Sequence, residues 1–127
     1  MIRETIGNYG RFLSEQNTSE ILSLYSNEAE IIPDGLPSIT TIKNIKKFYE
    51  TTFSSIKIAG DLIITSVDVD TSNELAIVRC EEKASVTDLA TDNVLKSYFR
   101  ELFVLKKEKD IWKIYKYMFS QNISQAE

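Results

Sequence analysis

The first third of the chain has apolar residues at helical spacing. In the N-terminal segment they lie four, three and four positions apart, at Ile2, Ile6, Tyr9 and Leu13. Residues spaced in this way share one face of an α-helix, so the pattern predicts an amphipathic helix over residues 2–16.

Two further helices are predicted before residue 56. Asn17, with Glu20 three positions later, is an N-cap signal for a short second helix. The apolar residues of that helix are Ile21, Leu22, Leu24 and Tyr25. Residues 29–32 are expected to be extended and to end in a Pro-Asp-Gly turn. Thr40 or Thr41 then caps a third helix, whose apolar face is Ile42, Ile45, Phe48, Tyr49 and Phe53.

From Ile56 onward the spacing changes to the alternation that is typical of strands. Residues 63–69 alternate in a first strand, and three more strands are predicted over residues 74–87, 94–106 and 111–120. Three helices followed by four antiparallel strands predict an α+β fold, with the helices packed on one face of the sheet. The chain has no repeat and no linker, so residues 1–127 are expected to form a single domain.

Two of these strands have informative faces. In the second strand, one face is apolar, with Ala76, Val78 and Cys80. The opposite face carries Ile77, Arg79, Glu81 and Lys83, and a charged strand face usually lies in solvent. The last strand is apolar on both faces, with Trp112, Ile114 and Met118 alternating with Tyr115, Tyr117 and Phe119. Because the helices cover one face only, this pattern favours a homodimer that covers the other.

Composition then limits the chemistry. The 127 residues are 43% hydrophobic and 27% charged, which is enough for a core without metal or disulfides. There is no histidine, and Cys80 is the only cysteine. This excludes nucleophile–histidine pairs, histidine metal sites and an intramolecular disulfide. We expect no metal and no cofactor, and either binding alone or chemistry by carboxylate, tyrosine, lysine or arginine.

Charge and hydropathy limit the partners. The net charge is −4, and the basic clusters are short and lie beside acidic residues, which argues against nucleic acid. No apolar run approaches the roughly 20 residues of a membrane span. The N-terminal segment has no apolar stretch typical of a signal peptide. We therefore expect a cytoplasmic protein with neither a nucleic-acid nor a membrane partner.

Three segments carry a resemblance to a known family. They are LSLYSNEAEIIPDG (22–35), IKNIKKFYETTF (42–53) and YFRELFVLKKEKDIWKIYKYMF (98–119). Together they resemble the NTF2-like superfamily, in its SnoaL-like and ketosteroid-isomerase-like branch, over nearly the whole chain. The resemblance implies a curved sheet around a long helix, forming a cone with an open, ligand-sized mouth. It also implies a homodimer through the outer sheet face.

The resemblance further implies roles for single residues. In ketosteroid isomerases a first-helix tyrosine donates to the substrate oxyanion and two more tyrosines support it. These positions fall on Tyr9, Tyr25 and Tyr49, and a protonated strand aspartic acid of those enzymes corresponds to Glu101. Two converging donors would form an oxyanion hole, and an apolar pocket would raise the pKa of Glu101. The alternative is that the tyrosines are core residues with one polar end.

The catalytic base of those isomerases has no counterpart here. Its position falls on Ile32 or Pro33, and neither side chain accepts a proton. The nearby carboxylates are Glu30 and Asp34, the latter within the predicted turn. Steroid-isomerase chemistry is therefore not expected, and the candidate catalytic residues are Tyr9, Glu101, Asp34 and Glu30.

The resemblance turns the charged face of strand 74–87 into the cone, where Arg79 would pair with Glu101 or bind an anionic group. The solvent-facing alternative also remains open. The residues expected to line the ligand pocket are Tyr9, Phe12, Tyr25, Phe48, Tyr49, Phe53, Arg79, Glu101, Phe103, Tyr117 and Phe119.

Three functions agree with this pattern. The favoured one is a domain that binds a small, partly apolar ligand in the cone. The second is a cofactor-free isomerase, dehydratase or hydrolase with a carboxylate base and a tyrosine oxyanion donor. The third is a structural or dimerisation module whose cone is filled by its own side chains. A ligand site needs a cavity of roughly 300 Å³, and an enzyme also needs a carboxylate inside it.

Overall fold

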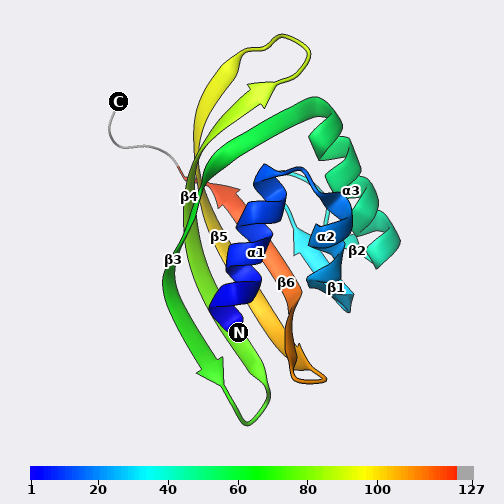
Figure 1. Cartoon of the computed structure of the whole chain (residues 1–127), viewed down its shortest axis with the longest axis vertical. Helices are drawn as coiled ribbons and strands as arrows, with labels where there is room; N and C mark the ends of the chain where they lie inside the picture. The colour runs from blue at the N-terminus through cyan, green and yellow to red at the C-terminus, as the bar shows by residue number, and fades with distance from the viewer. Residues whose placement is uncertain (123–127) are drawn as a thin grey trace.

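The computed structural model describes residues 1–122 as three helices and six strands. The helices are α1 (Ile2–Ser14), α2 (Thr18–Ser23) and α3 (Ile42–Ser55). The strands are β1 (Tyr25–Ile32), β2 (Ile39–Thr40), β3 (Ile56–Asp70), β4 (Leu75–Asp88), β5 (Val94–Glu108) and β6 (Ile111–Gln121). They form one sheet in the order β2-β1-β6-β5-β4-β3. Figure 1 shows the curved sheet with the helices on its concave side.

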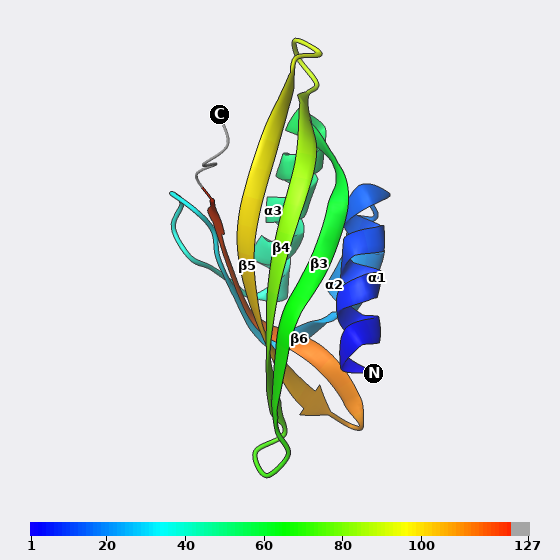
Figure 2. The ribbon, with the colours of Figure 1, turned by 90° about the vertical axis from the view of Figure 1, so that its left-hand side faces the viewer.

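The helices lie on one face of the sheet, here called the inner face. The opposite, outer face is turned toward the viewer in Figure 2, and no helix of the described chain crosses it. This is the α+β cone predicted from the sequence. The three predicted helices are confirmed, and so are two caps: Asn17 accepts from the Glu20 amide at 3.2 Å, and Thr41 accepts from the Asn44 amide at 3.3 Å.

The sheet is larger than predicted, and it is mixed. β1 pairs in parallel with β6, and the other described strand pairs are antiparallel. Tyr25, expected in the second helix, begins β1 instead, because Leu24 ends α2 and Tyr25 aligns with Ile114 of β6. The short strand β2 was not predicted. The boundary between α2 and β1 depends on a partner strand nearly ninety residues away, and the local spacing of apolar residues does not contain that information.

A β-bulge explains why β6 is apolar in both alternation phases. The register between β5 and β6 shifts after Val104, so the inward positions of β6 change phase. Trp112 and Ile114 pack on the core before the shift, and Tyr117 and Phe119 pack there after it. The apolar residues at both alternating sets of positions in β6 therefore lie mainly on the inner face of the sheet. A similar shift after Ile64 changes the phase of β3.

The faces of β4 are settled by burial. Ala76, Val78 and Cys80 are buried on the inner face, and the same alternation continues through Glu82 to Ala84. The charged residues at the alternate positions therefore lie on the outer face. The expectation that this charged face lines the cone is wrong.

The described residues contain no helix that is long and apolar enough to cross a membrane.

Candidate functional site

Three tyrosine hydroxyl groups meet between α1, β1 and α3. The Tyr49 hydroxyl lies 2.8 Å from that of Tyr9 and 2.6 Å from that of Tyr25. Burial raises the pKa of each tyrosine well above its usual value, so all three remain neutral hydrogen-bonding groups. The structure thus brings together the three tyrosines that the family resemblance singled out.

Tyr117 contacts both Tyr9, a member of this tyrosine cluster, and Glu101. Its hydroxyl donates to Glu101 Oε1, and its ring stacks on Phe103 with the centroids 4.4 Å apart. The Tyr9 ring packs edge-on against both, at 5.3 Å from Phe103 and 5.5 Å from Tyr117. All of these side chains are buried. They form the closed, aromatic inner end of the cone.

Glu101 is a buried carboxyl group on the inner face of β5, with only 3% of the residue exposed. Burial raises the pKa of Glu101 to about 8, and the neighbouring Glu82 carboxyl raises it too, against the opposing effect of the Tyr117 hydrogen bond. A carboxyl group with this pKa is mostly protonated at neutral pH. Glu101 therefore has an O–H group to donate.

Glu82 is the site residue that the sequence analysis missed. It is 4% exposed on the inner face of β4, and its carboxyl group is within hydrogen-bonding reach of that of Glu101. Burial raises the pKa of Glu82, although the hydrogen bond with Glu101 opposes the rise. The signal was present, because the alternation of Val78 and Cys80 reaches Glu82 at the next step.

Small side chains lie beside this carboxyl pair. In the cross-strand register, Gly60 of β3 aligns with Ala84 of β4, which aligns with Ser97 of β5. This small-residue row lies at the next inner-face position of β4 after Glu82. The cross-strand neighbours of Glu82 itself are Leu62 and Phe99. The row thus places a hydrogen atom, a methyl group and a hydroxymethyl group at the inner positions next to the carboxyl groups.

Ser97 adds a polar group to that row. The residue is 9% exposed and lies at an inner-face position of β5. Gly60 must be a glycine for a steric reason. A Cβ atom there would lie 2.5 Å from the Lys83 carbonyl oxygen, which is too close for any side chain.

Arg79 does not join the site. It lies on the outer face, where its Nη2 atom is 3.2 Å from Glu81 Oε2 and its Nη1 atom donates to the Cys80 carbonyl oxygen. The prediction that Arg79 pairs with Glu101 inside the cone is wrong, because the alternation of β4 places the two side chains on opposite faces of the sheet.

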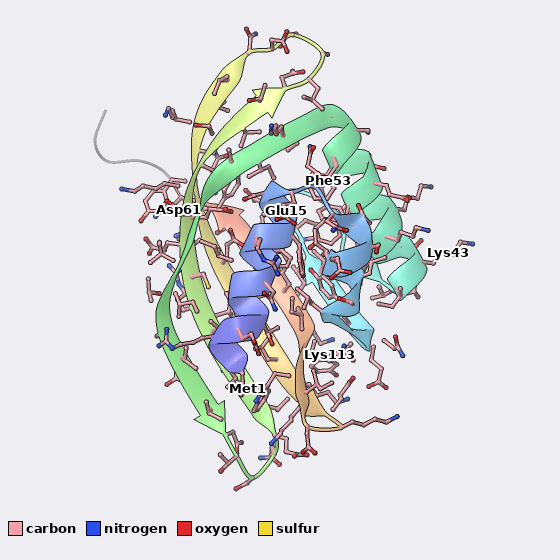
Figure 3. All side chains as sticks on the ribbon, viewed as in Figure 1. Met1, Glu15, Lys43, Phe53, Asp61 and Lys113 are labelled. Atoms are coloured by element: carbon pink, nitrogen blue, oxygen red, sulfur yellow. The ribbon has the colours of Figure 1, made fainter. Side chains whose placement is uncertain are left out.

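The other predicted aromatic residues gather on the inner side. Phe48 and Phe53 contact the Tyr49 ring, with centroids 5.2 Å and 5.9 Å away, and Figure 3 shows Phe53 between α3 and the sheet. Phe119 lies 5.3 Å from the Tyr117 ring. Phe12 is also buried, beneath the guanidinium group of the neighbouring Arg11 at 4.6 Å.

The two remaining candidate bases support neighbouring strands. The Asp34 carboxylate accepts from the Gln121 amide at 3.1 Å, and Glu30 pairs with Lys116 at 3.0 Å. Glu30 also borders a surface hollow of about 480 Å³ between β1, β2 and the start of α3. No described hydrogen bond or ion pair joins either carboxylate to Glu101. The structure therefore does not bring them to the tyrosine and glutamate groups.

Within residues 1–122, no three His, Cys, Asp or Glu side chains are arranged to hold a metal ion.

The curved sheet, the helices on its concave side and the polar groups inside define a domain of the NTF2-like and cystatin-like fold class. The chain belongs to the SnoaL-like domain family, whose family model matches residues 2–124. None of the curated proteins compared with it by sequence matches.

Solved structures are similar over almost the full length. A ketosteroid isomerase-like protein from Erwinia carotovora atroseptica has a TM-score of 0.90 at 22% identity, covering 97% of this chain and 95% of its own. A provisionally assigned dehydratase of the NTF2-like family from Streptomyces avermitilis has a TM-score of 0.79 at 13% identity, with 97% and 94% covered. A cystatin-like domain from Nostoc punctiforme has a TM-score of 0.73 at 15% identity, with 98% and 76% covered. At these identities the likeness shows the fold.

Proposed function

We propose that the chain binds a small, partly apolar molecule on the inner face of the sheet, with one polar atom of the ligand at the Glu82–Glu101 pair. The observation that carries this proposal is the burial of two carboxyl groups beside the small-residue row. Burying an ionisable group is unfavourable unless it is paired or neutralised, and such groups are concentrated at functional sites.

The surroundings indicate the chemistry of the ligand. A protonated Glu101 donates a hydrogen bond, so it suits a carbonyl, hydroxyl or similar acceptor oxygen. Phe99 and Phe119 lie in an edge-to-face pair 6.3 Å apart, on the strand positions next to the carboxyl groups. Aromatic walls with a few polar groups are typical of sites for flat, apolar molecules. We therefore propose a compact aromatic or alicyclic compound that carries one oxygen.

The alternative of a filled cone accounts for only part of the interior. Tyr9, Tyr49 and Phe103 are fully buried and fill the closed end with their own rings. The level beyond Glu82 carries the smaller side chains of Ala84 and Ser97. The structural role of the tyrosines and a ligand site near the glutamates are thus compatible.

Binding of 2-naphthol, measured by fluorescence anisotropy, tests the proposal. We expect saturable binding to the wild-type protein. Ser97→Phe places a ring in the small-residue row and should weaken binding about tenfold or more, which corresponds to roughly 1.4 kcal/mol. Ser85→Phe is the matched control, because position 85 lies in the outer alternation of β4. No saturable binding, or equal binding by both variants, would overturn the proposal.

A further inference from the structure

One edge of β1 is only partly covered by a neighbouring strand. The short strand β2 (Ile39–Thr40) pairs with Glu30 and Ile31 alone. Along the same edge, residues 27–29 have no strand partner in the part of the chain that the structure describes. The register with β6, on the opposite edge of β1, is also interrupted between Tyr25 and Glu30. The backbone groups of an unpaired strand edge can bind another extended chain.

The surface hollow of about 480 Å³ lies along this unpaired edge. Four consecutive residues of β1, residues 27–30, border it, and its other walls are Thr40, Thr41, Ile42 and Lys116. Successive side chains of a strand point to opposite faces of a sheet. A hollow that is bordered by four consecutive residues therefore lies at the edge of β1, where the backbone is accessible.

We propose that the unpaired edge of β1 binds an extended segment of a partner protein, which adds a strand to the sheet. β2 already shows the geometry, because it pairs antiparallel with the same edge. The added segment continues the row of β2 toward residue 27. In this mode of recognition the main-chain hydrogen bonds give affinity and the side chains give specificity. Neither Glu82 nor Glu101 borders the hollow, so the inference does not depend on the proposed function.

The backbone of β1 indicates which residues pair with the segment. The Glu28 amide already donates to Ser26 Oγ at 3.2 Å. In an antiparallel pair, every second residue exchanges N–H···O=C bonds with the residue opposite. Asn27 and Ala29 therefore exchange these bonds with the segment. The segment residue opposite Glu28 lies between them, and its own amide points away from β1.

The side chains around the hollow indicate the chemistry of the segment. Glu28 contacts Lys106 at 2.8 Å through one carboxylate oxygen, and 70% of its side chain is exposed. A carboxylate has two acceptor oxygens, and opposite charges directly across a strand pair are favourable. The residue opposite Glu28 should therefore be lysine or arginine. Ile42, a partly buried apolar residue at the wall of the hollow, suits apolar side chains on either side of that cation.

An NMR titration with the peptide acetyl-Thr-Val-Lys-Val-Thr-amide tests the inference. We expect saturable shifts of the Asn27 and Ala29 amide signals and slower hydrogen exchange at both. N-methyl groups on the two valines should abolish binding, because these amides face β1. An N-methyl group on the lysine should leave binding unchanged, because its amide faces away. No saturable shift, or equal effects of the two modifications, would overturn the proposal.

Protein variants test the position of the cation. Glu28→Lys should weaken peptide binding about fivefold or more, and Glu28→Gln should weaken it less. Glu15→Lys, at the exposed end of α1 and outside the hollow, is the matched control and should bind like the wild type. Equal binding by Glu28→Lys and wild type would overturn the proposal. Protection of the Asn27 and Ala29 amides that rises with protein concentration alone would also overturn it, by showing that a second copy occupies this edge.

Discussion

Glu82 and Glu101 are diagonal neighbours on adjacent strands, with both carboxyl groups buried on the inner face of the sheet. β4 and β5 pair Cys80 with Glu101 and Glu82 with Phe99, so the two glutamates lie one step apart across the ladder. They are 4% and 3% exposed, respectively. This arrangement links the stability of the protein to the proton affinity of the carboxyl pair.

The first prediction concerns the pH dependence of stability. The pKa of Glu101 is about 8 in the folded protein and about 4.3 in the unfolded chain, so the folded state binds more protons between these values. The titratable groups beside Glu101 are Glu82, Tyr117, Cys80 and Tyr9, and of these only Glu82 ionises in this pH range. The contribution of Glu101 is therefore greatest below about pH 4 and declines up to about pH 8, by roughly 3 to 5 kcal/mol in all.

Glu101→Gln removes this titration. Urea unfolding of wild type and variant should show that the variant gains stability relative to wild type between about pH 5 and about pH 9. Glu81→Gln, at a half-exposed position on the outer face, is the control and should show no such trend. A difference between Glu101→Gln and wild type that is independent of pH would show that Glu101 has an ordinary pKa.

The second prediction concerns the tyrosine hydroxyl groups. Tyr49 is the central member, with Tyr9 and Tyr25 as its partners. Tyr49→Phe removes two hydrogen bonds and leaves two buried hydroxyl groups short of a partner, so we expect a loss of about 1 to 3 kcal/mol in unfolding free energy. Tyr25→Phe removes one bond and should cost less. Equal losses of unfolding free energy for Tyr49→Phe and Tyr25→Phe, measured by urea titration, would contradict a hydrogen-bond network centred on Tyr49.

The third prediction compares two glycines. Gly60→Ala places a Cβ atom 2.5 Å from the Lys83 carbonyl oxygen, so the strands must separate and stability should fall by about 1 to 3 kcal/mol. Gly7 lies in α1 with nothing within 4 Å of an added Cβ atom, and Gly7→Ala should stabilise the helix by about 0.5 to 1 kcal/mol. Thermal unfolding of both variants measures these opposite shifts. A stabilised Gly60→Ala would show that β3 and β4 are not in this close contact.

The fourth prediction concerns self-association. Ile63, Ile77, Leu102 and Met118 are exposed apolar residues on the outer-face positions of four neighbouring strands. We expect a homodimer through this face, because a second copy would cover them. Leu102→Lys should convert the dimer to a monomer in light scattering. Leu95→Lys, at an exposed position near the tip of the β4–β5 hairpin, should not change the mass. A monomeric wild-type protein would contradict the expectation.

The fold was largely predictable from local spacing and one resemblance. The helices, the caps at Asn17 and Thr41 and the long strands follow from patterns within about fifteen residues. The parallel pairing of β1 with β6 did not follow, because the partner strand is distant in sequence. The bulges did not follow either, because they depend on the register between paired strands, which the spacing within one strand does not contain. The outward position of Ile63 is one consequence, since the bulge after Ile64 changes the phase of β3.

The site was predictable only in part. Tyr9, Tyr25, Tyr49 and Glu101 were reached through the resemblance, and Arg79 was assigned to the wrong face by the same route. Glu82 needed no resemblance, because the buried alternation of β4 leads directly to it. A glutamate at an inward strand position contradicts the usual apolar pattern, and such exceptions often mark functional groups.

The most direct test of the carboxyl pair is the 13C NMR titration of the glutamate side-chain carboxyl carbons, assigned with Glu82→Gln and Glu101→Gln. We expect the pair to retain a proton near pH 7, with the Glu101 signal titrating around the pKa of about 8. Addition of 2-naphthol should shift both signals and leave that of Glu81 unchanged. Full ionisation of both groups by about pH 6, with no response to 2-naphthol, would contradict the account.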